Sequence, residues 1–318
     1  KCTLIIAALL LSLVLVQAQQ KDYPIQPVSF TQVHVNDHFW EPKMRINAEV
    51  TIPYILKMCR EHGRIDNFLA AAGKKENKLC SEFTFDDTDV YKWIEGASYA
   101  LQVKPDPKLA LYLDSLIAII GAAQEPDGYL YTFRTIKPLV PHEWVGEKRW
   151  INDSVLSHEL YNSGHLYEAA YAHYNATGKK NLLNIALKNA DLLCKDFGWD
   201  QLHIYPGHQI VEIGLAKLYR ITGEQKYLDL AKFFLDIRGP KGDVYNQANK
   251  KVIDQTEAVG HAVRAAYMYS GMADVAALTG DASYLKAIDA IWEDVVTKKL
   301  YITGGIGATN AGEAFGDA

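Results

Sequence analysis

Apolar residues recur every three or four positions along most of the chain, which is the spacing of helices with one buried face. Beyond about residue 45 this pattern predicts ten helices, beginning near residues 45, 64, 87, 106, 158, 179, 207, 224, 257 and 281. Residues 21–44 are rich in Pro, β-branched and aromatic residues, so an extended segment is expected there. A long loop rich in Pro, Gly and Trp is expected over 125–153. The predicted fold class is therefore all-α.

Three parts of the chain repeat one helix–turn–helix design. Each places a Thr-Gly pair between two amphipathic runs, and a leucine follows five residues after each glycine. The glycines are Gly178, Gly223 and Gly280. Because glycine adopts the left-handed conformation without Cβ strain, each glycine is expected to end one helix and open the turn to the next.

Stacked helical hairpins form either an open solenoid or a closed toroid. The turn glycines at 178, 223 and 280 are 45 and 57 residues apart, so the loops between hairpins differ in length. A solenoid of regular repeats has nearly constant periods, whereas variable loops suit a toroid whose mouth binds a small ligand. We therefore expect a closed toroid of helix pairs.

A histidine occupies a similar place near the start of the first helix in three successive hairpins. The stretches are SHEL at 157–160, GHQI at 207–210 and GHAV at 260–263, which contain His158, His208 and His261. Taken singly, each histidine is explained by a helix cap or a buried core position. If the first helices line the toroid, however, the three imidazoles share one mouth, and we expect a common cleft.

Two further residues are expected to bind ligand at this mouth. Asp89 belongs to an acidic group with Asp86 and Asp87 at the start of another helix, where acids also suit the helix dipole. Trp150 lies in the long loop, and an exposed tryptophan suits stacking on a sugar. The nineteen tyrosines and six tryptophans are explained equally by core packing or by such a polar aromatic cleft.

The C-terminal stretch YITGGIGATNAGEAFGDA surrounds a single carboxylate, Glu313, with glycines. It contains no Gly-Lys-Ser/Thr, and Asn310 interrupts the dinucleotide-binding spacing, so no phosphate site is predicted. A carboxylate beside glycines can approach a ligand closely and act as a general acid. The alternative, on local sequence alone, is an ordinary surface loop.

The N-terminus has the layout of a secretory signal. A lysine precedes an apolar run from Leu4 to Val16, and small and polar residues follow, so residues 1–20 are predicted to be a signal peptide. The run is too short for a stable membrane span. Export to the periplasm or the extracellular space is therefore expected. The net charge of −5, without a long basic run, gives no sign of a nucleic-acid partner.

Six stretches together resemble glycoside hydrolase family 127. They are FDDTDVYKWIEGASYAL, QEPDGYLYT, SHELYNSGHLYEAAYAHYNATGK, PGHQIVEIGLAKLYRITG, AVGHAVRAAYMYSGMADVAALTGD and YITGGIGATNAGEAFG, which lie between residues 85 and 316. The whole resemblance spans roughly residues 28–316. The resemblance implies a catalytic (α/α)6 barrel over 45–318 and a retaining hydrolase that releases β-L-arabinofuranosyl or related sugars from plant oligo- or polysaccharides. It also implies that Glu313 is the acid/base and that His158, His208 and His261 contact substrate.

The same resemblance implies a cysteine nucleophile bound to zinc. In the family, its ligands follow the Gly-Glu-Ala-Phe motif that contains Glu313, and they would therefore lie beyond Ala318. We expect no metal ligands within this chain, a barrel that is incomplete at its C-terminus, any β-sandwich domains further on, and little activity from these residues alone. Cys59, Cys80 and Cys194 match none of the family's cysteine motifs.

Two other functions remain open at this point. One is a non-catalytic carbohydrate-binding or helical-repeat module that uses the same aromatic mouth. The other is a helical-toroid hydrolase with paired carboxylates, in which Glu313 acts with Asp87 or Asp89.

Overall fold

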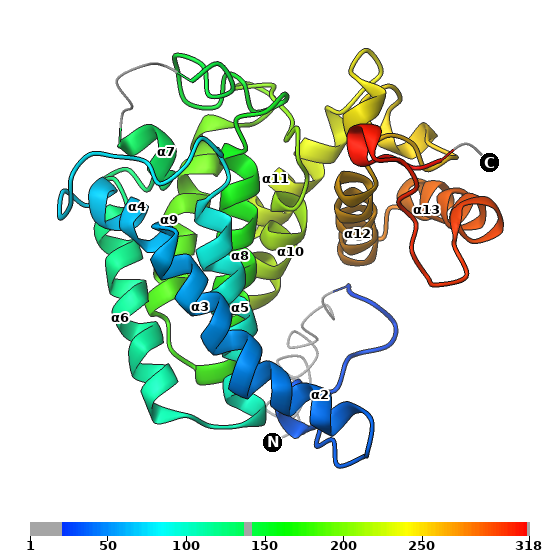
Figure 1. Cartoon of the computed structure of the whole chain (residues 1–318). Helices are drawn as coiled ribbons and strands as arrows, with labels where there is room; N and C mark the ends of the chain where they lie inside the picture. Colours follow the sequence, from blue (N-terminus) through cyan, green and yellow to red (C-terminus); the bar gives the residue numbers. More distant parts are fainter. Residues whose placement is uncertain (1–20, 137–141, 317–318) are drawn as a thin grey trace, which may run out of the picture.

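The structure, a computed structural model, describes residues 21–136 and 142–316, and within them it is a stack of helical hairpins (Figure 1). The predicted signal peptide lies outside these residues. The first helices of the five hairpins are α3 (Ile52–Glu61), α5 (Asp87–Val103), α8 (Glu159–Thr177), α10 (Val211–Thr222) and α12 (Ala262–Thr279). Their second helices are α4 (Arg64–Ala71), α6 (Pro107–Ala123), α9 (Asn181–Asp196), α11 (Gln225–Asp236) and α13 (Ala282–Asp294).

The hairpins pack side by side in sequence order. The first helices contact one another in the order α3, α5, α8, α10 and α12, and the second helices α4, α6, α9 and α11 do the same. The Tyr284 hydroxyl of α13 donates a hydrogen bond to Asp236 at the end of α11 and continues the second series. This double layer is the arrangement of an (α/α)6-type barrel, and the predicted all-α toroid is confirmed.

The shorter elements lie between the hairpins or at the chain ends. They are η1 (Phe30–Gln32), α2 (Trp40–Ile46), η2 (Asn47–Thr51), α7 (Thr132–Thr135), η3 (Val244–Asn246), η4 (Val252–Asp254), η5 (Val295–Lys299) and η6 (Ala311–Glu313). Among residues 21–136 and 142–316 there are no β-strands, only two isolated β-bridges. In the same part of the chain, no helix has the length and apolar character needed to cross a bilayer.

The three turn glycines behave as the sequence predicts. Gly178, Gly223 and Gly280 have φ angles of 70°, 73° and 75°, and each N–H donates to the carbonyl oxygen four residues earlier. Each glycine therefore caps the helix before it in the left-handed conformation.

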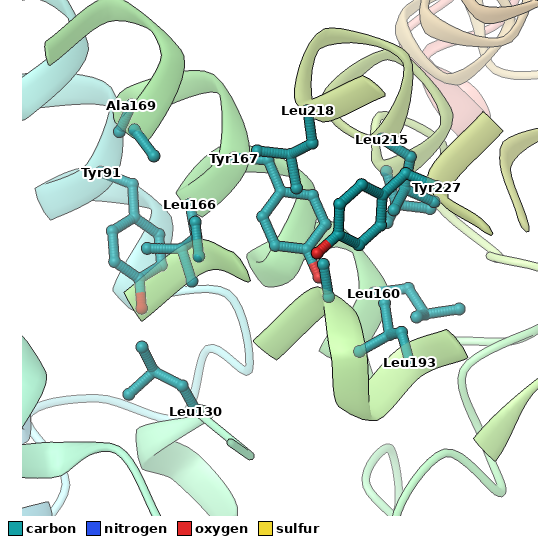
Figure 2. Packing of buried hydrophobic residues seen from close by; sticks show 14 of the residues in the cluster. Tyr91, Leu130, Leu160, Leu166, Tyr167, Ala169, Leu193, Leu215, Leu218 and Tyr227 are labelled. Atoms are coloured by element: carbon teal, nitrogen blue, oxygen red, sulfur yellow. The ribbon is translucent and has the colours of Figure 1, made fainter. Parts of the chain in front are cut away.

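The main core lies between the two helical layers. Figure 2 shows Tyr167 of α8 and Tyr227 of α11 beside Leu215 and Leu218 of α10. The buried Tyr167 hydroxyl is satisfied in this apolar surrounding, because it donates a hydrogen bond of 2.8 Å to Asn189 Oδ1 on α9. Helix α8 is buried on nearly every side, since α5, α9 and α10 all pack against it.

Two glycines let α8 and α10 approach closely. A Cβ on Gly164 would lie 2.5 Å from Ile210 Cγ2, and a Cβ on Gly214 would lie 2.8 Å from Tyr167 Cβ. Contacts this short are sterically forbidden, so both positions require glycine. The close approach brings the start of α10, and with it His208, next to α8.

The structure corrects the expected boundary at residue 44. Helix α2 already begins at Trp40, because Asp37 Oδ1 accepts hydrogen bonds from the N–H groups of Phe39, Trp40 and Glu41. Pro42 falls in the first turn, where a missing N–H is tolerated. The extended N-terminal segment is therefore confined to residues before 40.

Candidate active site

The structure brings His158, His208, His261 and Glu313 together. The ring centroids of His158 and His208 are 5.9 Å apart, and those of His208 and His261 are 5.7 Å apart. His261 Nε2 lies 2.7 Å from Glu313 Oε2. Three hairpins and the glycine-rich segment therefore contribute to one cluster, which we call the histidine end of the barrel.

The three histidines do not occupy identical backbone positions. His158 and His261 immediately precede α8 and α12, but His208 lies three residues before α10, which begins at Val211 rather than near 207. Ile210, with a φ of 153°, prevents an earlier helix start. The imidazoles nevertheless converge because α8 and α10 pack closely.

Two buried carboxylates fix the backbone of His158, which has the left-handed φ of 63°. Asp153 Oδ1 accepts from the N–H of Leu160 at 2.9 Å and so caps the start of α8. Glu159 accepts from the Tyr129 hydroxyl and from the Trp150 N–H. A left-handed non-glycine residue needs such support.

Hydrogen bonds also define the tautomers of His158 and His208. Nδ1 of His158 lies against the carbonyl oxygen of Leu156, and Nδ1 of His208 lies 3.0 Å from the carbonyl oxygen of Gln209. A carbonyl oxygen only accepts, so Nδ1 carries the hydrogen in both rings. In each neutral ring Nε2 is then an acceptor, suited to a sugar hydroxyl.

The mouth holds these imidazoles in the neutral state. Burial lowers the pKa of His158 to about 4. Burial, followed by the positive charge of Arg264, also lowers the pKa of His208 and of His261. Arg264 is itself buried and donates a hydrogen bond to the Gly207 carbonyl oxygen at 2.5 Å. A site with neutral acceptors and donors suits an uncharged, hydroxyl-rich ligand.

A second polar layer lies deeper along α8, beyond the three imidazoles. The Tyr161 ring lies 4.2 Å from the His208 ring and 4.6 Å from the His165 ring, measured between centroids. His165 is buried, and within the described residues neither of its ring nitrogens has a hydrogen-bond partner. Lys92 donates to the Tyr161 hydroxyl at 2.9 Å, and Tyr267 lies beside both His165 and His208.

A hollow of about 550 Å³ opens beside Glu313. Tyr267 and the small residues of α12 line one wall, and residues 306–313 line the other. This volume falls within the range of small-molecule sites. A larger hollow of about 940 Å³ lies by the long loop, but its lining includes neither Glu313 nor the three histidines.

The structure does not bring Trp150 to the histidine end. Its side chain is 3% exposed and packs against Tyr129 and Phe197, and its Nε1 donates to Asp196. A buried indole cannot stack on a ligand at the mouth. The expected ligand contact is therefore corrected: Trp150 is part of the core beneath the long loop.

The aspartates of α5 are also engaged elsewhere. Asp89 Oδ2 accepts from Arg64 Nε at 2.9 Å and lines a separate hollow of about 520 Å³ between α3 and α5. Asp87 is buried and accepts from the N–H and the hydroxyl of Thr132. Neither aspartate contacts Glu313, and each is held by partners of its own.

The cysteines of the described residues do not form a metal site. Cys59 is buried on α3, Cys80 contacts Arg64 and Asp86, and Cys194 lies near the end of α9. Within residues 21–136 and 142–316, no group of three or more His, Cys, Asp or Glu side chains is arranged to hold a metal ion. The residues present therefore do not fit zinc.

A helical barrel that presents neutral imidazoles and one exposed carboxylate at its mouth has the layout of a carbohydrate-active enzyme. The family model of the GH127 catalytic domain of β-L-arabinofuranosidases matches residues 32–318, and the chain belongs to this family. The resemblance seen in the sequence motifs is confirmed.

Individual relatives agree with this assignment. The chain is 38% identical over 278 residues to the non-reducing end β-L-arabinofuranosidase of Bifidobacterium longum subsp. longum, over 79% of this chain and 41% of that protein. A solved GH127 β-arabinofuranosidase has 58% identity and a TM-score of 0.89, over 93% of this chain and 47% of that one. The GH127 β-L-arabinofuranosidase of Geobacillus stearothermophilus T6 has 38% identity and a TM-score of 0.83, over 89% and 48%. The chain spans less than half the length of each relative.

Proposed function

We propose that this chain is the catalytic barrel of a retaining glycoside hydrolase that releases β-L-arabinofuranosyl or related sugars from plant-derived glycans. The observation that carries the proposal is that Glu313 lines a sugar-sized hollow and contacts His261, the last of three imidazoles that lie ring to ring. The names of the relatives support the sugar class. Those relatives are longer, so the activity proposed is that of the whole protein.

Glu313 is the proposed general acid and base. In the first step it donates a proton to the glycosidic oxygen while the bond to the anomeric carbon breaks and its electron pair stays on that oxygen. In the second step it removes a proton from the water that releases the sugar. Its side chain is 73% exposed, which gives it access to a leaving group and to water.

His158 and His208 are proposed to bind the sugar ring. Their Nε2 atoms would accept hydrogen bonds from sugar hydroxyls, since Nδ1 of each is directed to a backbone carbonyl oxygen. Both imidazoles remain neutral at neutral pH, so this acceptor role persists under ordinary conditions.

The first step also needs a nucleophile that forms a bond to the anomeric carbon. The family resemblance assigns this role to a cysteine held by zinc, which would keep the thiol ionised at neutral pH. Because the residues described here do not fit zinc, we propose that both the ligands and the nucleophile belong to other parts of the full-length protein. We also propose that the protein is exported, with residues 1–20 as its signal peptide.

The test is hydrolysis of p-nitrophenyl arabinofuranosides by the complete gene product and by Glu313→Gln. Loss of general acid/base catalysis is expected to lower turnover about 10²–10⁴-fold. Glu293→Gln removes another exposed glutamate, on α13, and should leave turnover unchanged. Undiminished turnover by Glu313→Gln would refute the acid/base assignment, and an inactive parent enzyme would refute the sugar class.

A further inference from the structure

Both ring nitrogens of His261 are already engaged by this chain. Nδ1 accepts a hydrogen bond of 3.2 Å from the backbone N–H of Arg264, which makes His261 the N-cap of α12. Since Nδ1 accepts, the hydrogen of the neutral ring lies on Nε2. Nε2 therefore donates to Glu313 Oε2 across the 2.7 Å contact. His261 thus differs in tautomer from His158 and His208, whose Nε2 atoms are acceptors.

The backbone holds His261 and Glu313 next to each other. His261 and Ala314 form an isolated antiparallel bridge, and the Phe315 N–H donates to the Gly260 carbonyl oxygen at 3.0 Å. The Phe315 side chain is buried in a small apolar cluster with residues of α12 and α13. The glycine-rich segment is therefore fastened to the start of α12 on the C-terminal side of Glu313.

The Glu313 side chain has little other support. It is 73% exposed, its residue has the left-handed φ of 48°, and the preceding Gly312 has a φ of 71°. The contact with His261 is the one hydrogen bond or ion pair found for this carboxylate among the described residues. An exposed carboxylate on a glycine-rich turn would otherwise sample several rotamers.

The neighbours of His261 hold its ring in place and uncharged. The Tyr245 ring packs edge-on against it at a centroid distance of 5.4 Å, and the Arg264 guanidinium lies over the same tyrosine. Burial and then the Arg264 charge lower the pKa of His261. The imidazole consequently stays a neutral, single-hydrogen donor instead of forming a charged pair with Glu313.

We propose that His261 is a positioning residue for Glu313: its Nε2–H holds Oε2, so that Oε1 carries the transferred proton and faces the leaving group. This inference rests on the proposed function, and it differs from the substrate contact that the family resemblance implies for His261. With both nitrogens engaged, the ring has no remaining polar atom for a sugar hydroxyl.

The decisive experiment measures kcat/KM of the complete gene product on aryl arabinofuranosides whose leaving groups increase in basicity. The main variant is His261→Asn, because asparagine can still cap α12 but is too short to reach Glu313. Poor leaving groups need the acid most, so the loss is expected to grow with leaving-group basicity, from less than about threefold to 30-fold or more. Glu313→Gln should show the same trend.

His208→Asn is the matched control, since it removes a neighbouring imidazole that contacts His261 but is not hydrogen-bonded to Glu313. Its loss should be the same for every leaving group. The double variant His261→Asn/Glu313→Gln should be no slower than Glu313→Gln alone, because both changes disable the same proton transfer.

The inference would be overturned if His261→Asn lowered kcat/KM equally for all leaving groups and if this loss added to that of Glu313→Gln. His261 would then be assigned a contact with the sugar. In that case the trend for Glu313→Gln would still support the proposed function. If Glu313→Gln itself shows no trend, the acid/base assignment fails and the role of His261 fails with it.

Discussion

The two ends of the barrel use polar groups in different ways. At the histidine end, imidazoles are neutral and their neighbours are buried cationic and aromatic side chains. At the opposite end of α10, Arg220 donates to both oxygens of Asp22 and also to Asp274, which in turn accepts from the Tyr23 hydroxyl. We call this second group, Asp22, Tyr23, Arg220 and Asp274, the ion-pair end.

The difference follows from what each end has to bind. Paired charges satisfy one another and attach the N-terminal segment to α10 and α12. The neutral Nε2 atoms of His158 and His208 are directed away from the backbone carbonyls that hold Nδ1. The comparison indicates that one end stabilises the fold and the other is reserved for ligand.

The largest expected effect is a change in the free energy of unfolding with pH, which should differ between the two ends. The pKa of His158 is lowered to about 4 in the fold, whereas an unfolded histidine titrates near 6.5. Between these values the unfolded chain binds more protons, so acidification weakens the contribution of His158 by about 3 kcal/mol. The destabilisation caused by His158→Asn should therefore shrink as the pH falls from 7 to 4. Asparagine tolerates the left-handed backbone at this position.

Asp22→Asn provides the contrasting pH series. The Arg220 guanidinium lowers the pKa of Asp22, so this carboxylate adds stability above its unfolded pKa near 3.8 and loses it only on further acidification. Its contribution should stay constant from pH 7 to about 5. Urea unfolding across this range measures both variants, and parallel pH profiles would contradict the distinction. The buried carboxyls of Asp87 and Asp153 titrate in the parent protein and in both variants. Their contributions therefore cancel when the free energies of unfolding of variant and parent are subtracted.

Arg220→Met is expected to have the next largest effect. It leaves two partly buried carboxylates without their shared cation, which should lower the free energy of unfolding by about 2 kcal/mol. The reference is Lys226→Met, which breaks an exposed pair with Asp191 and should cost less than about 0.5 kcal/mol. kcat/KM of the complete gene product should not change. A fall in kcat/KM at unchanged stability would instead place the ion-pair end in the binding machinery.

His208→Leu should behave in the opposite way to Arg220→Met, with a lower kcat/KM and little change in stability. Loss of one hydrogen bond to a sugar hydroxyl is expected to lower kcat/KM about tenfold, which corresponds to about 1.4 kcal/mol. The free energy of unfolding should change little, because the Nδ1 hydrogen bond to the adjacent carbonyl oxygen is local. Steady-state kinetics and urea unfolding on the same preparations test both parts, and unchanged kinetics would remove His208 from the site.

The sequence predicts the hairpins well because their signals are local. A glycine at the end of a helical run is sufficient to indicate a left-handed cap, and the caps at Gly178, Gly223 and Gly280 follow this rule. The shared position of His158, His208 and His261 also depended only on the repeat. The three imidazoles converge because the hairpins stack, and the bridge between His261 and Ala314 brings Glu313 to them.

The sequence-based predictions failed where the outcome depends on contacts between residues far apart in the chain. Whether Trp150 is exposed depends on Glu159 and Asp196, which accept its N–H and Nε1–H, and no local pattern reports such partners. Tyr161 was missed because α8 is buried on almost every side, so its sequence has no contrast between a core face and a ligand face. The tautomer of His261 depends on Arg264 and Glu313, which only the fold brings to its two nitrogens.

The smallest expected effect is that of salt. Raising the ionic strength from 0.1 to 1 M shortens the Debye length from about 10 Å to about 3 Å, so it weakens interactions between exposed charges. The destabilisation caused by Arg220→Met should fall by roughly 0.5 kcal/mol, because its partners are partly accessible. At pH 7 the destabilisation caused by His158→Asn should not depend on salt, since the imidazole is neutral. An equal salt dependence for both variants would mean that His158 is charged, and the histidine end would no longer differ in kind from the ion-pair end.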